Sequence, residues 1–212
     1  MAIKIEYHGH SCFVISVEGY RIALDPYDGH VPGYAPLELS ANEVMCSHEH
    51  LDHCYREAVT LTSGGINPFA VEEFVSYHDD AKGTLRGSNT IRIFAWRGIR
   101  IAHLGDMGCV PAREIEAALQ NLDAVMIPVG GTYTLDACQS NTLIEAIQPK
   151  IVIPMHYRCG RYGLELIDFI ESFARLRNDV TWYEGNTILI EKKMGRQTAI
   201  LKYNDPNVWK EI

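Results

Sequence analysis

Short apolar runs rich in β-branched residues recur along most of this chain, and such runs predict β-strands. In the first half they lie at Ile3–Tyr7, Cys12–Val17, Tyr20–Leu24, Val44–Cys46, Phe74–Tyr77, Thr90–Ala95 and Ile99–Leu104. In the second half they lie at Ala124–Ile127, Ile151–Pro154, Val180–Tyr183, Thr187–Ile190 and Ala199–Leu201. Hairpin turns are expected at Glu18-Gly19-Tyr20 and Trp96-Arg97-Gly98, because Gly readily adopts the positive φ of a tight reversal.

Helical periodicity is found mainly in the second half of the chain. One helix is expected to open at Pro111, with an apolar stripe running from Ile115 to Leu122. Two further helices are expected at Asp136–Ile147 and at Leu164–Arg177. Many strands with helices added outside them indicate a layered α/β protein whose strands come largely in hairpins.

Length and charge narrow the class of protein. The 212 residues suit one domain, 1–212, with a sizeable buried core. The formal net charge is −8 and no run of Lys and Arg occurs, so we expect no nucleic-acid partner. A small anionic substrate is not excluded, because one or two local cations suffice to bind it.

Two features of the sequence bear on location. No stretch approaches the about 20 apolar residues of a membrane span, and the N-terminus lacks the apolar segment of a signal peptide. The six cysteines, at positions 12, 46, 54, 109, 138 and 159, form no CxxC pair. We therefore expect a cytoplasmic protein, with no membrane partner, whose cysteines are free and mostly packed thiols.

The candidate chemistry is concentrated in the run Ser47-His48-Glu49-His50-Leu51-Asp52-His53. Imidazole is the commonest metal ligand in proteins, and carboxylates bind the same divalent ions. If the preceding strand ends near Ser47, positions 48, 50 and 52 project to one side, and a turn then brings His53 back beside Asp52. Such a loop can offer two ligands to one ion and two to its neighbour.

Three more metal-binding side chains follow predicted strands. They are His78, Asp106 and His156. Strand ends are where an α/β scaffold collects site residues, because these positions are rigid and still open to solvent. We therefore expect these residues to complete the site begun by the 48–53 run.

With these residues in place, the chain resembles the metallo-β-lactamase superfamily, whose signature is His-x-His-x-Asp-His. Further segments are similar to the branch that contains L-ascorbate-6-phosphate lactonase and related metal-dependent hydrolases. These segments are Gly9-His10-Ser11-Cys12-Phe13, Leu24-Asp25-Pro26, Ile127-Pro128-Val129-Gly130-Gly131 and Pro154-Met155-His156-Tyr157. The resemblance covers roughly residues 7 to 160. It implies a four-layer αββα sandwich with two metal ions in a cleft at one edge.

The resemblance also implies a ligand set. One ion would be held by His48, His50, His78 and Asp106, and the other by Asp52, His53, Asp106 and His156. Asp106 and a hydroxide would bridge the ions, and Asp52 would orient that nucleophile and relay its proton. Glu49 should point away from the metals. A histidine at position 50, where the di-iron oxygen-reducing branch has a carboxylate, argues against that branch.

Several histidines and one aspartate near the motif have two interpretations each. His103 is an alternative to His78 as the third histidine ligand, although its place on a strand face favours a buried or supporting role. Asp25 either accepts a hydrogen bond from a ligand imidazole or is a turn residue before Pro26. His8 and His10 either line the cleft or form hydrogen bonds within a turn.

Cationic and aromatic residues near the motif are candidates for substrate binding. Arg158 and Arg161 follow the last ligand, and Lys82 and Arg86 follow His78. A guanidinium there could bind a phosphate or a carboxylate, although loop cations are more often only solvated. The hydroxyl of Tyr133 could polarise a substrate oxygen.

These features predict a dinuclear metallohydrolase in which a metal-bridging hydroxide attacks a small anionic ester or lactone. The alternatives are a phosphodiesterase or nuclease of the same superfamily and a non-catalytic metal-binding protein. Imidazole and carboxylate ligands suit zinc, manganese or iron. Homo-oligomers are also possible, because the aromatic tail with Trp209 could pack on a neighbouring copy.

Overall fold

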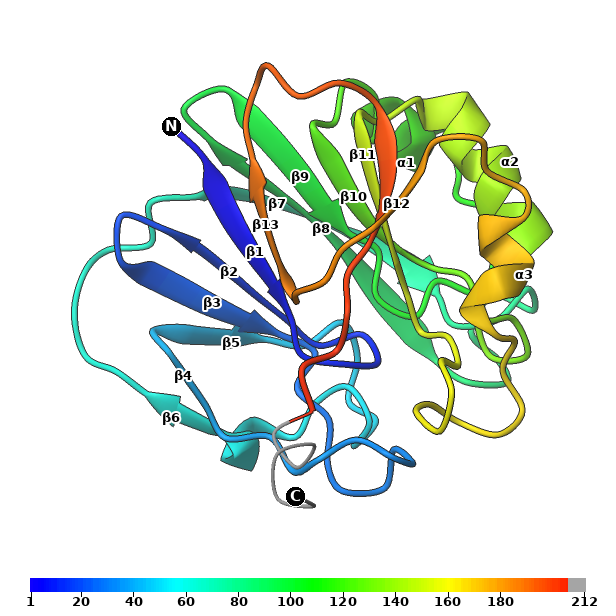
Figure 1. Ribbon diagram of the computed structural model, residues 1–212, viewed down its shortest axis with the longest axis horizontal. Coiled ribbons are helices and arrows are strands. Elements are labelled where there is room, and N and C mark those ends of the chain that lie inside the picture. The colour runs from blue at the N-terminus through cyan, green and yellow to red at the C-terminus, as the bar shows by residue number, and fades with distance from the viewer. Residues whose placement is uncertain (206–212) are drawn as a thin grey trace.

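Two β-sheets packed face to face form the centre of the computed structural model, which describes residues 1–205 (Figure 1). One sheet is five-stranded, in the order β13-β1-β2-β3-β5. Its strands are β1 (Ile3–Tyr7), β2 (Phe13–Val17), β3 (Tyr20–Leu24), β5 (Glu43–Met45) and β13 (Thr187–Ile190). Strands β1, β2, β3 and β13 pair in antiparallel fashion, and β5 runs parallel to β3.

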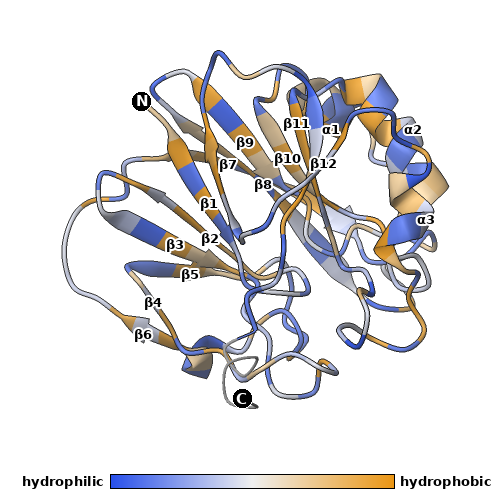
Figure 2. Cartoon of the chain, in the orientation of Figure 1, coloured by the Kyte–Doolittle hydropathy of each residue, from blue (hydrophilic) through white to orange (hydrophobic). Residues whose placement is uncertain are grey.

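The second sheet is seven-stranded, in the order β12-β14-β11-β10-β9-β8-β7. Its strands are β7 (Ala70–Tyr77), β8 (Ser88–Trp96), β9 (Ile99–His103), β10 (Ala124–Pro128), β11 (Ile151–Met155), β12 (Val180–Trp182) and β14 (Gln197–Ile200). Strands β9, β10, β11 and β14 are parallel neighbours, and every residue of β10 and β11 is buried. Covered on both faces, these two strands have continuous apolar sequences rather than alternating ones (Figure 2).

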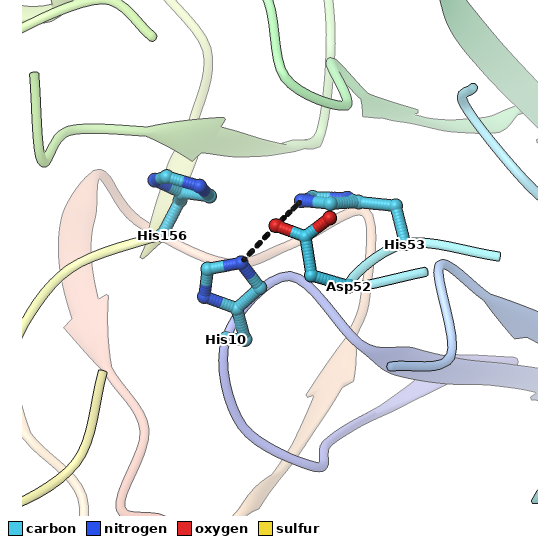
Figure 3. Close-up of side chains that lie close together, drawn as sticks. All are labelled: His10, Asp52, His53 and His156. Atoms are coloured by element: carbon cyan, nitrogen blue, oxygen red, sulfur yellow. Dashed lines mark ion pairs between the residues drawn. The ribbon is translucent and has the colours of Figure 1, made fainter. Parts of the chain in front are cut away.

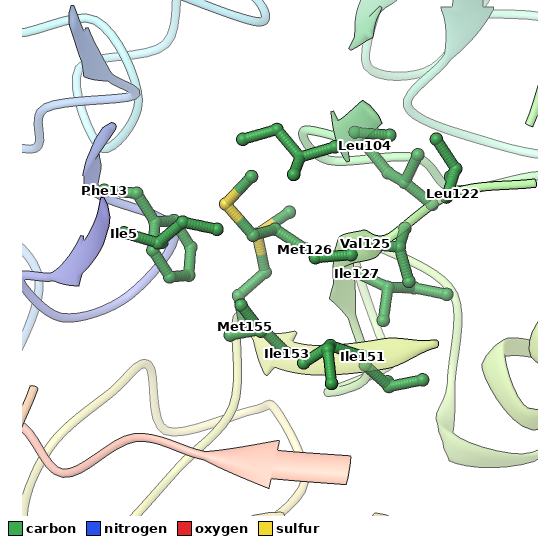
Figure 4. Close-up of a cluster of buried hydrophobic side chains, with 14 of the residues drawn as sticks. Ile5, Phe13, Leu104, Leu122, Val125, Met126, Ile127, Ile151, Ile153 and Met155 are labelled. Carbon is green, nitrogen blue, oxygen red and sulfur yellow. The ribbon is translucent and has the colours of Figure 1, made fainter. Parts of the chain in front are cut away.

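The main core lies between the two sheets. Phe13 and Ile5 from the five-stranded sheet point toward Met126 and Met155 of the seven-stranded sheet (Figure 4). Side chains alternate along each antiparallel strand, so Val14, the neighbour of Phe13, lies on the opposite face. There it joins a smaller buried cluster.

The outer layers of the sandwich differ from each other. Helices α1 (Arg113–Ala118), α2 (Ala137–Ile147) and α3 (Ile170–Ala174) lie beside the seven-stranded sheet (Figure 1). The outer face of the five-stranded sheet is covered by loops and by the two-stranded sheet of β4 (Leu39–Ala41) and β6 (Val59–Leu61). A single 3₁₀ turn, Arg56–Ala58, precedes β6. The layered α/β class is therefore confirmed, with a small β-ribbon as the outer layer on this side in the part of the chain described.

The two predicted hairpin turns are confirmed. Glu18 and Gly19 have φ of 50° and 86°, and Arg97 and Gly98 have φ of 47° and 81°. The helix predicted at Asp136–Ile147 is also confirmed, because Asp136 caps α2 by accepting a hydrogen bond from the backbone N–H of Gln139.

The predicted helix at Leu164–Arg177 is largely wrong, because only Ile170–Ala174 is α-helical. The backbone before it is held by other partners: Asp168 N–H donates to the Gly130 carbonyl, and Asp168 carbonyl accepts from Arg158 N–H. These contacts take up backbone groups that a helix would need, so a loop forms instead.

The expectation of free thiols is wrong for one pair. Cys46 and Cys54 form a disulfide, with Cα atoms 5.3 Å apart, whereas Cys12, Cys109 and Cys138 are free, as is Cys159. No helix within residues 1–205 has the length and apolarity needed to cross a bilayer. Trp209, named above for a possible oligomer contact, lies outside the described residues.

Candidate metal centre

The loop that carries the 48–53 run is tied down at both ends by one buried carboxylate. Asp25 Oδ1 accepts from Ser47 N–H at 2.6 Å, and Asp25 Oδ2 accepts from Ser47 Oγ at 2.6 Å. The same carboxylate accepts from His53 Nδ1 at 2.9 Å. This bond fixes the His53 tautomer and leaves its Nε2 facing the cluster. The Cys46–Cys54 disulfide joins the two flanks of the same loop.

Two other histidines reach the cluster from the seven-stranded sheet. His78 follows β7, and its Nδ1 lies 3.0 Å from the Tyr133 carbonyl oxygen. Because a carbonyl can only accept, Nδ1 carries the proton and Nε2 is left as a donor atom for a metal. His156 follows β11 and adopts φ of 53°, and its N–H donates to the His10 carbonyl.

Asp106 is held in a tight turn after β9. Asn89 Oδ1 accepts from Asp106 N–H at 2.9 Å, and Asn89 Nδ2 donates to the Leu104 carbonyl at 2.8 Å. Between them, Gly105 has φ of +56°, and a Cβ there would lie 2.3 Å from Asn89 Oδ1 and 2.4 Å from Ser47 Cβ. Only glycine fits this position, and its absence of a side chain lets Asp106 approach the loop.

These segments place Asp106 at the centre of the cluster. Its Oδ2 lies 3.0 Å from His53 Nε2, 3.4 Å from His78 Nε2 and 3.4 Å from His156 Nε2. Around it are two groups of donor atoms that share no residue, and a third group of His48, His53 and Asp106 links them; within each group the donor atoms lie within 4.8 Å of one another. One group is His48, His50 and His78, and the other is His10, Asp52, His53 and His156 (Figure 3).

The donor atoms fit divalent cations. Several are buried and have no hydrogen-bond partner among residues 1–205. They include His48 Nε2, His53 Nε2, Asp106 Oδ1, and both ring nitrogens of His10 and His156. A buried polar atom without a partner costs about 1–3 kcal/mol, so a set of them in one place indicates that a ligand satisfies them together. Imidazole and carboxylate donors suit zinc, manganese and iron.

The electrostatics also favour cation binding. Burial lowers the pKa of His10 and His48 to about 4, so both rings are neutral, which is the form that binds metal. Burial opposes charge on Asp106 as well, but the facing His156 and His53 hold its pKa well below the ordinary value. For His53, burial disfavours the cation, yet Asp106 and Asp25 on either side raise its pKa well above the usual value. A proton on His53 therefore competes with a metal ion for the same nitrogen.

A cavity of about 230 Å³ opens onto these donors. It is lined by His50, Asp52, His78, Arg86, Asp106, Tyr133, His156 and Leu164. Two of the residues considered for substrate binding, Arg86 and Tyr133, are therefore at the cavity, with the Arg86 guanidinium 5.5 Å from the Tyr133 ring centre. Lys82 and His8 do not line it.

Arg158 and Arg161 were expected as possible anion-binding residues, and the structure directs both elsewhere. The Arg158 guanidinium lies 4.6 Å from the Phe169 ring centre and donates to the Glu165 carbonyl. Arg161 pairs with Asp205 at 2.6 Å. Neither residue lines the cavity. Both side chains therefore contact residues of the surrounding loops and not the donor groups.

His103 does not face the donor groups. Its Nε2 donates to the Ser11 carbonyl at 3.1 Å, and its Nδ1 accepts from Gly105 N–H at 3.3 Å. Both ring nitrogens are thus used inside the core, and His78 rather than His103 stands beside Asp106. Glu49 is exposed and pairs with Arg56, pointing away from the cluster as expected.

Three residues at the site were not singled out from the sequence. Ser47 connects Asp25 to the loop, Asn89 holds the turn before Asp106, and Leu164 lines the cavity. Ser47 stands inside the motif and could have been found there. Asn89 lies next to the strand expected at Thr90–Ala95, and Leu164 is the first residue of the helix expected at Leu164–Arg177. Nothing in the sequence around either residue marks it as part of a site.

The chain is similar in sequence to several known proteins. Residues 4–156 match the family model described as the beta-lactamase superfamily domain. A metal-dependent hydrolase from Thermoplasma acidophilum is 26% identical over 187 residues, covering 73% of this chain and 83% of that protein. One from Carboxydothermus hydrogenoformans is 26% identical over 191 residues, covering 73% and 84%.

Solved structures show the same fold. A proposed Zn-dependent hydrolase of the metallo-β-lactamase superfamily from Thermotoga maritima has a TM-score of 0.73 and 28% identity, covering 94% of this chain and 98% of that one. A metallo hydrolase from Ignicoccus hospitalis shares the fold, with a TM-score of 0.63 at 20% identity over 91% of this chain and 100% of that one. The fold expected from the resemblance is confirmed, and the lactonase branch stays a prediction.

Proposed function

This chain belongs to the metallo-β-lactamase superfamily, and from that premise we propose that it hydrolyses a small anionic ester or lactone at a site for two divalent ions. It is a metal-dependent hydrolase, like the relatives named above. The bond it cleaves and the number of ions belong to the proposal. We expect zinc or manganese, with iron as an alternative, and a cytoplasmic location.

The observation that carries the dinuclear proposal is the position of Asp106. Its Oδ2 lies 3.4 Å from His78 Nε2 in one donor group, and 3.0 Å from His53 Nε2 and 3.4 Å from His156 Nε2 in the other. Donors that share one ion at bond lengths of about 2.1 Å lie roughly 3.0–3.6 Å apart. These distances support the proposal that Asp106 would contribute a ligand to both ions.

Two divalent ions in this site would supply Lewis-acid activation and a water whose pKa is lowered toward about 7. Protein side chains would orient the water, transfer its proton and hold the ligand imidazoles in place. The Asp52 side chain is 29% exposed and lines the cavity, so its carboxylate can orient a nucleophilic water and carry a proton to the leaving group. Asp25 keeps His53 in the tautomer that presents Nε2.

The size and charge of the cavity support the proposed substrate class. A volume of about 230 Å³ admits a small group rather than a polymer strand. Arg86 is the one permanent cation among its lining residues, so we propose that it binds an anionic group of the substrate beside the scissile bond. The net charge of −8 favours a single local contact over a broad cationic surface, and we expect no nucleic-acid partner.

The hydrolase proposal is tested with Asp106→Ala. Bound metal is counted by elemental analysis, and turnover is measured on lactones, carboxylic esters and phosphodiesters. We expect loss of metal and of turnover, with esters or lactones preferred by the wild-type protein. Undiminished metal and activity in the variant would refute the proposal. Preference for phosphodiesters would favour the phosphodiesterase alternative, and full metal occupancy without any turnover would favour a non-catalytic metal-binding protein.

The substrate proposal is tested with Arg86→Gln and the matched control Lys82→Gln. Both residues lie on the loop after His78, but only Arg86 lines the cavity. We expect Arg86→Gln to raise KM for anionic esters at least about tenfold, which is about 1.4 kcal/mol, and to leave neutral esters unaffected. Lys82→Gln should change neither. Equal KM changes for anionic and neutral esters would show that Arg86 does not recognise charge.

A further inference from the structure

One histidine in the cluster, His10, has no place in the ligand set that the resemblance implies. It lies in the turn between β1 and β2, and its side chain is fully buried. Neither of its ring nitrogens has a hydrogen-bond partner within residues 1–205. Such a buried imidazole loses its hydrogen bonds to water without replacing them, which is uncommon unless the ring binds something.

The position of the ring indicates what it binds. His10 Nε2 lies 3.6 Å from Asp52 Oδ2, and the ring centre is 4.3 Å from that of His156 (Figure 3). This N···O separation is longer than the roughly 2.7–3.2 Å of a hydrogen bond. It matches two donors on one ion, since bonds of about 2.1 Å at angles of 109–120° place the donors about 3.4–3.6 Å apart.

The backbone holds the ring in this position at a cost. His10 adopts φ of +51°, in the left-handed region that disfavours residues other than glycine by roughly 1–2 kcal/mol. The conformation is fixed from two sides, because the His10 carbonyl accepts from His156 N–H at 3.0 Å and Tyr34 packs against the preceding Gly9. The turn therefore presents His10 to the ligands in a single, constrained orientation.

We propose that His10 is a further protein ligand of the ion held by Asp52, His53 and His156. The inference rests on the proposed function, because it assumes that an ion binds this group. Counting Asp106 as a ligand of both ions, that ion would have five protein donors, whereas the ion at His48, His50 and His78 would have four. The two ions would thus differ, with the one beside the exposed His50 more open to substrate.

The test compares His10→Gly, His10→Gln and the control His8→Gln. Glycine tolerates the left-handed backbone, so His10→Gly removes the ring without disturbing the turn. Glutamine can donate a hydrogen bond to Asp52 from near the Nε2 position but is a poor metal ligand. His8 lies in the same segment and outside both donor groups. Each protein is stripped of metal, checked for folding by circular dichroism, and titrated with Zn²⁺ against a chromophoric chelator, with bound zinc counted by elemental analysis.

We expect wild-type protein and His8→Gln to bind two ions, and both His10 variants to bind one normally and the other at least about tenfold more weakly. Wild-type affinity for both ions in His10→Gly would overturn the inference. So would a weakened His10→Gly with full recovery in His10→Gln, because hydrogen bonding to Asp52 would then suffice. Either result leaves the proposed function standing, whereas a wild-type protein that binds no ion would overturn both.

Discussion

The Cys46–Cys54 disulfide closes the loop that carries the candidate ligands between residues 47 and 53, and its removal has a calculable effect. The bridged residues are 8 apart in sequence. In the chain-entropy description, closing a loop of about 9 residues removes roughly 8.5 cal/mol/K from the unfolded state, or about 2.5 kcal/mol at 25 °C. We therefore expect Cys46→Ser/Cys54→Ser to lower the free energy of unfolding by about 2.5 kcal/mol, a sizeable part of the about 5–15 kcal/mol typical of a domain.

Metal affinity should respond much less than stability. In the folded protein the loop ends are also held by Asp25, which accepts hydrogen bonds from Ser47 and His53. The disulfide acts mainly on the unfolded chain, so the folded variant should bind Zn²⁺ within about tenfold of the wild-type affinity.

The assay is urea unfolding of metal-free protein, followed by circular dichroism, alongside zinc titration of the folded protein. Thiol counting on denatured protein should give four thiols before reduction and six after it. The control Cys138→Ser/Cys159→Ser removes two exposed, free thiols and should leave stability unchanged. If the unfolding free energy of Cys46→Ser/Cys54→Ser lies within about 0.5 kcal/mol of the wild-type value, the entropic argument is refuted. A collapse of zinc affinity would show that the disulfide, and not Asp25, holds the loop.

Three further changes test the parts that support the site. Asp25→Asn removes the charge that orients His53, and we expect a 10- to 100-fold loss of zinc affinity, measured by chelator competition. Gly105→Ala should cost at least about 1–2 kcal/mol from its positive φ alone, read as a lower thermal midpoint together with reduced zinc uptake. Asp123 is buried, and against that burial Lys150 and Lys192, each 2.9 Å away, hold its pKa below the ordinary value. A lowered folded pKa stabilises the protein above the unfolded pKa of about 4, and this stability is lost as the pH falls through the folded value. Asp123→Asn should therefore cost about 1–2 kcal/mol at pH 7 and flatten the loss of stability below about pH 4, measured by urea unfolding across pH. An unchanged acid slope, or unaltered zinc binding in the other two variants, would contradict these assignments.

The parts of the site that depend on local spacing could be predicted from the sequence. The run from His48 to His53 brings its donors together through its own turn, and His78 and Asp106 follow strands whose ends meet at one edge. Alternation along the strand favoured His78 over His103, because His103 shares a face of β9 with Ile101, and the structure places its ring in the core.

The parts that depend on distant packing could not be predicted. Arg158 was a reasonable anion ligand from its position in the sequence, but its direction is set by Phe169, which a β-bridge places beside it. The same bridge region replaces the first turns of the expected helix with loop. The Cys46–Cys54 disulfide was missed for a related reason, since two cysteines 8 residues apart meet only because the intervening loop folds back on Asp25.

The scattered origin of the donor atoms has a consequence for how the protein acquires and keeps its metal. Donors come from the β1–β2 turn, the 47–53 loop and the ends of three strands in the other sheet, so His10 and His156 are 146 positions apart in the chain. No short segment of an unfolded or nascent chain can gather one complete group, and selection of the ion falls to the folded protein. Because only the folded protein binds the ion tightly, metal binding stabilises the whole fold. Free metal at 100 times its dissociation constant adds about 2.7 kcal/mol to the stability of the native state. A shortage of metal would therefore first increase the rate at which the protein unfolds and is degraded. The reaction carried out by each metal-loaded molecule would not change.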